Sequence, residues 1–211
     1  MPPYFSFTLA AVSEFLKSCE RFRSVEGFLS DFEGFTLMQL AAHGTGVGEI
    51  VEIGSYLGRS TCFLAAGTLK TGREKVHAVD HFRGSPEHQA GQSFASKVLE
   101  EEGTTLHRFH ANLRRVGLLE KVSTIQSASD QAAHSWTQSI RLLFIDGDHS
   151  YEASRRDFEC WAPFVGKHGY VCFHDIGGWP GVTRFYKELL EQTQEFREIL
   201  TVETLKVIER T

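Results

Sequence analysis

Residues 50–58 read Ile-Val-Glu-Ile-Gly-Ser-Tyr-Leu-Gly, an apolar run that enters a turn with two glycines. The run predicts a buried strand, and a helix is predicted after the turn, over residues 60–66. A second strand, predicted at residues 76–79, ends at Asp80. This order of strand, helix and strand indicates two parallel strands joined by a helical crossover.

The same alternation continues to the end of the chain. Further strands are predicted at 122–125, 141–145 and 169–173, helices at 106–117, 151–164 and 182–191, and two last strands at 199–202 and 205–208. The pattern predicts an α/β fold: a Rossmann-like, doubly wound, mostly parallel sheet, to which the C-terminal hairpin adds one antiparallel strand. Caps at Ser13 and Asp31 predict two earlier helices. We therefore expect an N-terminal helical segment, residues 1–45, packed on a core of residues 46–211 in a single domain.

Composition narrows the class of protein. The chain has 211 residues, of which 41% are hydrophobic and 23% charged, as in one soluble globular domain. A net charge of −5 argues against nucleic acid as a partner. The four cysteines are far apart, which predicts reduced thiols, and residues 1–5 form neither an export signal nor a membrane span. We expect a cytoplasmic protein without a membrane partner, and the apolar faces of the N-terminal helices suit either a cover for the site or a homo-oligomer.

The glycine turn and Asp80 predict one half of a binding site. In an open parallel sheet, ligands bind at the carboxyl ends of the strands where the strand order reverses. Glycines at 54 and 58 let a backbone approach a ligand, and Asp80 can accept hydrogen bonds from both hydroxyls of a ribose. The turn has the pattern E-x-G-x-x-x-G instead of the dinucleotide pattern G-x-G-x-x-G. The carboxylate of Glu52 therefore favours a cationic cofactor over a pyrophosphate.

A second group of polar residues predicts the chemistry. Asp146 ends the strand at 141–145, His149 follows three residues later, and His174 and Asp175 end the strand at 169–173. Parallel strands end at one edge of a sheet, so these side chains should converge. An imidazole there can take a proton from an alcohol, and carboxylates can hold a divalent metal that lowers the pKa of that alcohol.

Four blocks carry a resemblance to a known family. Residues 51–61, Val-Glu-Ile-Gly-Ser-Tyr-Leu-Gly-Arg-Ser-Thr, resemble the first motif of class I methyltransferases that use S-adenosylmethionine. Residues 78–80, 144–152 and 172–175 resemble the second motif, the fourth motif and the block after the fifth strand. Over about residues 25 to 210 the chain is similar to small bacterial O-methyltransferases, among them sugar O-methyltransferases of macrolide pathways.

The resemblance implies a set of cofactor-binding residues. They are Glu52, Gly54, Ser55, Tyr56, Gly58, Ser60, Asp80, Ser129 and Asp146. Glu52 and Gly54 would line the methionine part of S-adenosylmethionine, Asp80 the ribose, and residues 127–130 the adenine. Ala128 stands where such relatives often carry an aspartate, so the adenine contact would fall to Ser129 or to backbone.

The resemblance also implies a catalytic centre. Asp146, His174 and Asp175 would hold a divalent metal, magnesium or manganese, with His149 as general base and Asp146 as the other catalytic residue. The relatives have a carboxylate at the position of His174, and magnesium prefers oxygen ligands, so the metal is left open. A metal-free variant would use His149 and His174 as acid-base groups. His107 and His110 are interpreted as a solvated helix face.

These expectations lead to a functional hypothesis with two alternatives. The hypothesis is an O-methyltransferase that acts on a small-molecule hydroxyl acceptor, a sugar or polyhydroxylated metabolite. The first alternative is a catechol-like or other phenol acceptor, which ionises more readily and needs less help from a base. The second is a non-catalytic accessory protein that binds cofactor. The loop that begins at Phe82 is a candidate lid, and Trp179 would stack on a sugar ring or wedge a helix against the sheet.

Overall fold

The computed structural model of this protein describes residues 8–211 and contains a seven-stranded sheet with the order β3-β2-β1-β4-β5-β7-β6. The strands are β1 (Glu49–Ile53), β2 (Val76–Asp80), β3 (Val122–Gln126), β4 (Ile140–Ile145), β5 (Val165–Phe173), β6 (Phe196–Val202) and β7 (Leu205–Arg210). Strands β1 to β5 pair in parallel, and β7 lies antiparallel between β5 and β6. The predicted fold class is confirmed, including the single reversed strand.

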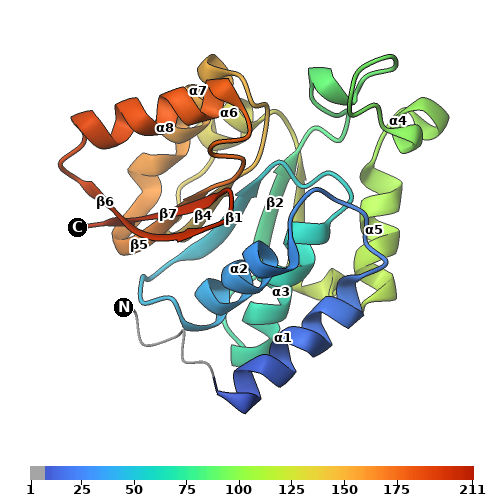
Figure 1. Ribbon diagram of the computed structural model, residues 1–211, viewed down its shortest axis with the longest axis horizontal. Coiled ribbons are helices and arrows are strands. Elements are labelled where there is room, and N and C mark those ends of the chain that lie inside the picture. The colour runs from blue at the N-terminus through green and yellow to red at the C-terminus, as the bar shows by residue number, and fades with distance from the viewer. Residues whose placement is uncertain (1–7) are drawn as a thin grey trace.

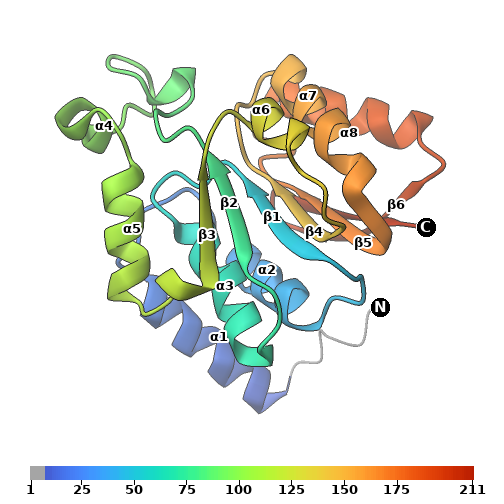
Figure 2. The ribbon, with the colours of Figure 1, turned by 180° about the vertical axis from the view of Figure 1, so that it is seen from behind.

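Helices cover both faces of the sheet (Figures 1 and 2). They are α1 (Leu9–Phe22), α2 (Asp31–His43), α3 (Arg59–Thr71), α4 (Lys97–Glu102), α5 (Leu106–Arg115), α6 (Ser129–His134), α7 (Tyr151–Trp161) and α8 (Pro180–Gln192). One hydrophobic core joins α1, α2, α3 and α5 to one face, and a second joins α6, α7 and α8 to the other. Successive strand residues alternate between these cores, because side chains of a strand point to opposite faces.

The first two helices begin earlier than predicted. Helix α1 starts at Leu9, because the Thr8 hydroxyl accepts a hydrogen bond from the Ala11 N–H at 3.1 Å, so Ser13 lies inside the helix. Helix α2 is capped by Ser30 instead of Asp31. Ser30 and Glu33 form a reciprocal capping box, which satisfies two backbone N–H groups at once.

Two short helices, α4 and α6, were not predicted. Each has six residues and lacks the apolar stripe by which a longer helix is recognised. No helix between residues 8 and 211 is long and apolar enough to cross a membrane. The four cysteines are free thiols, and the opening residues 1–5 lie outside the described residues.

The sheet positions the site through its strand order. The chain moves from β1 to β2 and β3 on one side and from β4 onward on the other, so the order reverses between β1 and β4. The carboxyl ends of β1, β2, β4 and β5 therefore meet at one edge, where open parallel sheets bind ligands.

Candidate active site

A cavity of about 420 Å³ lies at this edge of the sheet. It is lined by the turn after β1, the end of β2, the residues after β4 and β5, and the start of α6. The segment after β2, with the 3₁₀ turn η1 (Pro86–His88), and Phe28 from before α2 complete its wall. The two predicted halves of the site thus border one cavity.

The turn after β1 is held by Asp80. Its Oδ2 accepts hydrogen bonds from the N–H groups of Ser55 and Tyr56, both at 2.9 Å, and its Oδ1 accepts from the Phe82 N–H at 2.6 Å. Gly54 has φ +84°, and a Cβ atom there would lie 2.1 Å from the carbonyl oxygen of Asp146. Only glycine fits this close contact between the ends of β1 and β4.

Glu52, which the resemblance places at the cofactor, does not line the cavity. Its side chain is 0% exposed and points to the sheet face that α3 covers. Three hydroxyls donate to its carboxylate, from Ser55 at 2.8 Å, Ser60 at 2.6 Å and Thr61 at 2.5 Å. Burial raises the pKa of Glu52 to about 7, and the three hydrogen bonds oppose that rise. Glu52 therefore stabilises the turn after β1 from the side of the sheet that α3 covers.

Most other residues predicted to bind the cofactor do line the cavity. They are Gly54, Ser55, Tyr56, Ser60, Asp80, Ser129 and Asp146. Gly58 does not. It has φ +91°, and a Cβ atom there would lie 3.0 Å from the ring of Phe109, so this glycine permits the turn and the packing of α5.

The far end of the cavity is formed by residues 127–130. The Ser129 hydroxyl accepts a hydrogen bond from the indole N–H of Trp161 at 2.9 Å, and Trp161 is a core residue. Asp157 of α7 also lines this end, and burial raises its pKa to about 6. Asp157 was not predicted, because it lies inside a helix and follows no strand.

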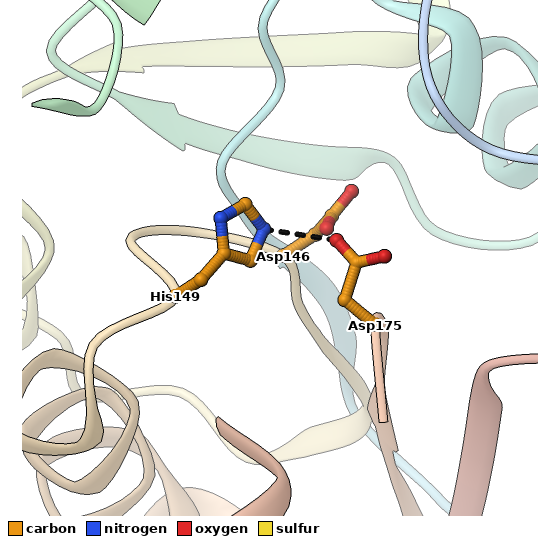
Figure 3. Close-up of side chains that lie close together, drawn as sticks. All are labelled: Asp146, His149 and Asp175. Atoms are coloured by element: carbon orange, nitrogen blue, oxygen red, sulfur yellow. Dashed lines mark ion pairs between the residues drawn. The ribbon is translucent and has the colours of Figure 1, made fainter. Parts of the chain in front are cut away.

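Asp146, His149 and Asp175 converge at the other end, as Figure 3 shows. One potential ligand atom from each lies within 4.8 Å of the others. The His149 Nε2 atom is 2.9 Å from Asp175 Oδ2, and its Nδ1 atom is 2.6 Å from Glu87 Oε1. Two carboxylates and an imidazole form a donor set suited to manganese, iron or zinc.

The surroundings of His149 favour its charged form. Burial by itself lowers the pKa of an imidazole, but the hydrogen bond to Asp175 and the charges of Asp146, Asp175 and Glu87 raise the pKa of His149 above its usual value. Its ring stacks on Trp179, with ring centroids 4.6 Å apart and 12° between the planes. This stacking fixes the ring plane, so that Nε2 faces Asp175.

His174 lies outside the group formed by Asp146, His149 and Asp175, which differs from the predicted ligand set. Its side chain is 3% exposed, its Nδ1 is 2.9 Å from Asp146 Oδ1, and its Nε2 is 3.2 Å from Glu33 Oε2. Burial lowers the pKa of His174, but the surrounding carboxylates outweigh burial and raise it far above its usual value. A ring that donates from both nitrogens has no lone pair for a metal.

The segment after β2 contributes Glu87, which sequence reasoning missed. His88, next to it, is buried and stacks on Tyr56 and on Phe28, with centroids 5.0 and 5.6 Å apart. These contacts hold η1 against the wall of the cavity. The ring of Phe94, from the same segment, packs on the ring of Trp179 with centroids 5.6 Å apart. The candidate lid is therefore packed over the cavity, with Glu87 directed at His149.

His107 and His110 belong to no metal-ligand group among residues 8–211. The His110 Nε2 atom lies 3.0 Å from the Thr124 hydroxyl. Asp148 lines the cavity and accepts a hydrogen bond from the Ser150 N–H at 2.8 Å, beside the N-terminus of α7.

Comparison with known proteins gives three findings. A protein-family model for a methyltransferase domain matches residues 51–176. The uncharacterised protein y4gI of Sinorhizobium fredii is 34% identical over 132 residues, which make up 60% of this chain and 13% of that protein. The chain thus spans a small part of the length of the curated relatives that it matches, 13% and 16% for two of them.

Two solved structures share the fold. The O-methyltransferase NovP has a TM-score of 0.66 and 19% identity, covering 84% of this chain and 78% of NovP. An O-methyltransferase from Bacillus cereus, solved in complex with SAH, has a TM-score of 0.61 and 17% identity, covering 98% of this chain and 92% of that one. At these identities the likeness establishes the fold.

Proposed function

This chain belongs to the methyltransferase-domain family, whose model matches residues 51–176, and from that premise we propose that it is an S-adenosylmethionine-dependent O-methyltransferase. The family match confirms the resemblance to methyltransferases carried by the strand-end motifs. The names of the two structural neighbours support oxygen as the atom methylated, and the SAH bound to one of them supports the cofactor.

One observation carries the proposal: a single cavity joins the glycine turn held by Asp80 to the group formed by Asp146, His149 and Asp175. The first end offers backbone and a carboxylate to a nucleoside. The second offers an imidazole and two carboxylates to a reacting hydroxyl. A methyltransferase needs these two ends close together, so that the methyl group of the cofactor lies next to the acceptor hydroxyl.

The cofactor end needs little rearrangement to bind S-adenosylmethionine, which supplies an electrophilic methyl group. Asp80 already orders the turn through three backbone N–H groups, and one lone pair of Oδ1 is left to accept a hydrogen bond from the ribose. Residues 127–130 and Asp157 surround the place where the adenine would lie, and Ser129 takes the role left open by Ala128.

At the chemical end, His149 in its neutral form, with Nε2 released from Asp175, would accept the proton of the acceptor hydroxyl. Asp175 and Glu87 orient its two nitrogens, and Trp179 shields one ring face from water. Proton removal by a positioned imidazole typically contributes about 10²–10⁴-fold to a rate. The acceptor hydroxyl must therefore take the place of Asp175 at His149 Nε2 or approach next to it. His149 lines the cavity, so an acceptor bound there can reach its ring.

Asp146 and Asp175 are the residues that would hold a divalent metal, because their carboxylates lie next to each other beside the ring of His149 (Figure 3). A bound cation would lower the pKa of a coordinated hydroxyl. In this arrangement His174 would donate to the two carboxylates from behind, in place of the predicted direct ligation.

We propose a sugar or polyhydroxylated metabolite as the acceptor. The cavity supports this with carboxylates for hydroxyl groups and with Trp179, Phe94 and Phe28 for the apolar face of a ring. The second candidate is a small phenol, which the same aromatic side chains favour. Among small molecules these two classes differ in how much they need His149, because a phenol has a lower pKa than an alcohol.

The proposal is tested by transfer of labelled methyl from S-adenosylmethionine to matched panels of sugars and catechols, with EDTA or with added manganese. Label in a sugar, lost with EDTA, is the expected result. Label in catechols alone would select the second candidate. If the protein binds S-adenosylhomocysteine (SAH) but labels no acceptor, the accessory role replaces the enzyme; if it does not bind SAH, the proposed cofactor is wrong.

A further inference from the structure

Glu33 lies in the first turn of α2, outside the residues that the family model matches, and its side chain is 3% exposed. A buried carboxylate is stable only when its oxygens are hydrogen-bonded. Glu33 meets this condition with partners from the cap of its own helix and from two distant parts of the chain. The two oxygens divide these partners between a structural tie and the candidate active site.

The Oε1 atom ties α2 to the turn between β6 and β7. It accepts hydrogen bonds from the Thr204 N–H at 2.9 Å, the Thr204 hydroxyl at 2.7 Å and the Leu205 N–H at 3.1 Å. These bonds involve no residue of the cavity. By themselves they would make Glu33 a structural residue.

The Oε2 atom faces the site. It accepts the Ser30 N–H at 3.0 Å and lies 3.2 Å from His174 Nε2. The other ring nitrogen of His174, Nδ1, lies 2.9 Å from Asp146 Oδ1 and 3.4 Å from Asp175 Oδ2. Because Glu33 holds one side of the ring, the opposite side is directed at both carboxylates.

The contacts continue to the proposed base. Asp175 Oδ2, which faces His174, is also the atom 2.9 Å from His149 Nε2. Glu33, His174, Asp175 and His149 thus form an uninterrupted series of carboxylate and imidazole groups. A change at Glu33 that rotates or frees the ring of His174 alters the support of Asp175 and, through it, of His149.

We propose that Glu33 is a positioning residue for the methyl transfer proposed above: through His174 it holds Asp146 and Asp175 where Asp175 meets His149. The catalytic centre therefore extends beyond the matched residues 51–176 into α2. Its effect on turnover rests on the proposed function; its effect on the position of His149 does not. Substituting such supporting partners typically costs about 10- to 100-fold in activity.

The test compares the full-length wild type with Glu33→Gln and with Thr204→Val. The second variant removes a hydrogen bond to the same carboxylate but leaves the His174 contact. Histidine-ring NMR at one pH, SAH affinity and turnover are measured for each. We expect Glu33→Gln to shift the ring signals of His174 and His149 and to lower turnover about 10- to 100-fold without changing SAH affinity. Thr204→Val should keep the wild-type His149 signals and turnover.

Unchanged His149 ring signals in Glu33→Gln would overturn the proposed role of Glu33. Equal shifts in Thr204→Val would overturn it too, because a purely structural role of Glu33 predicts them. Glu33→Asp keeps the charge and withdraws the oxygen from His174, so it should reproduce the shifts, and the test does not depend on one variant folding. The NMR comparison uses neither cofactor nor acceptor. A wild type without methyl transfer would therefore count against the proposed function and leave the role of Glu33 to be decided by the ring signals.

Discussion

Glu52 and Asp175 are carboxylates at the same edge of the sheet, yet their surroundings shift their pKa values in opposite directions. Glu52 faces three hydroxyls on the covered side of β1, and burial raises its pKa to about 7. Burial acts on Asp175 in the same direction, but hydrogen bonds from His149 and His174 outweigh it and hold the pKa of Asp175 well below its usual range.

The difference lies in the partners. Hydroxyls satisfy the lone pairs of a carboxylate without adding charge, whereas imidazolium groups add positive charge that stabilises the ionised form. The turn after β1 is thus supported by a buried acid whose pKa is raised, and the chemical half contains Asp175, whose pKa is lowered by two imidazole partners. A strand-end position predicts where an acid lies, and its neighbours decide what it can do.

The largest effect is expected from His149→Ala, which removes the imidazole from the chemical half. Turnover should fall about 10²–10⁴-fold, the contribution of a positioned base, while SAH affinity stays unchanged, since the cofactor half is intact. Turnover assays and calorimetric titration with SAH measure the two quantities. Equal losses in both would show that His149 supports the cavity instead of the proton transfer.

A smaller effect on stability is expected from Glu52. Its pKa is raised from 4.5 to about 7, so the folded state binds the proton more tightly than the unfolded state, and stability falls as pH rises through that interval. Relative to Glu52→Gln, the wild type should lose up to about 3 kcal/mol of unfolding free energy across it. Urea unfolding at several pH values gives the difference. Parallel curves for the two proteins would mean that Glu52 is ionised throughout.

Asp80→Ala should weaken SAH binding about 10- to 100-fold, because hydrogen bonds to a charged carboxylate, including those that order the turn, are lost. Asp148→Asn, a change to another acid of the same cavity that does not touch the turn, serves as the control for SAH affinity. Calorimetric titration measures both variants. Unchanged SAH affinity in Asp80→Ala would show that neither Asp80 nor the turn that it orders contributes to cofactor binding.

The smallest effect is expected from Trp179→Ala. Loss of the stacked ring beside His149 should lower turnover about 2- to 10-fold, the equivalent of an aromatic pair. Trp179→Phe keeps an aromatic face and should retain most of the activity in the same assay. If the phenylalanine variant is as slow as the alanine variant, then stacking on His149 is not the role of Trp179.

The sequence motifs predicted those parts of the site whose position depends only on residues near them in the chain. Asp80 ends β2, and three further residues of the site follow β4 or β5 within a few residues: Asp146, His149 and Asp175. Strand periodicity and parallel pairing were therefore enough to bring them to one edge. The position of Glu52 behind the cavity wall could also have been predicted, since strand alternation puts its side chain on the face opposite to Val51 and Ile53.

Glu33 and Glu87 could not be predicted in this way. They lie 141 and 62 residues from the histidines that they contact, and tertiary packing alone brings them there. The same packing decides the role of His174. Its position after β5 suggested a metal ligand, but Glu33 occupies its second nitrogen, which no local pattern shows.

We propose that Asp146 and Asp175, which lie together beside His149, act with it to ionise an acceptor hydroxyl next to the cofactor. The most direct test is transfer of labelled methyl to hydroxyl acceptors by the wild type and by a variant with both Asp146→Asn and Asp175→Asn, at saturating S-adenosylmethionine and with SAH binding measured in parallel. We predict labelled methyl ethers from the wild type and none from the variant, although the variant still binds SAH. Equal labelling by both proteins would contradict the account.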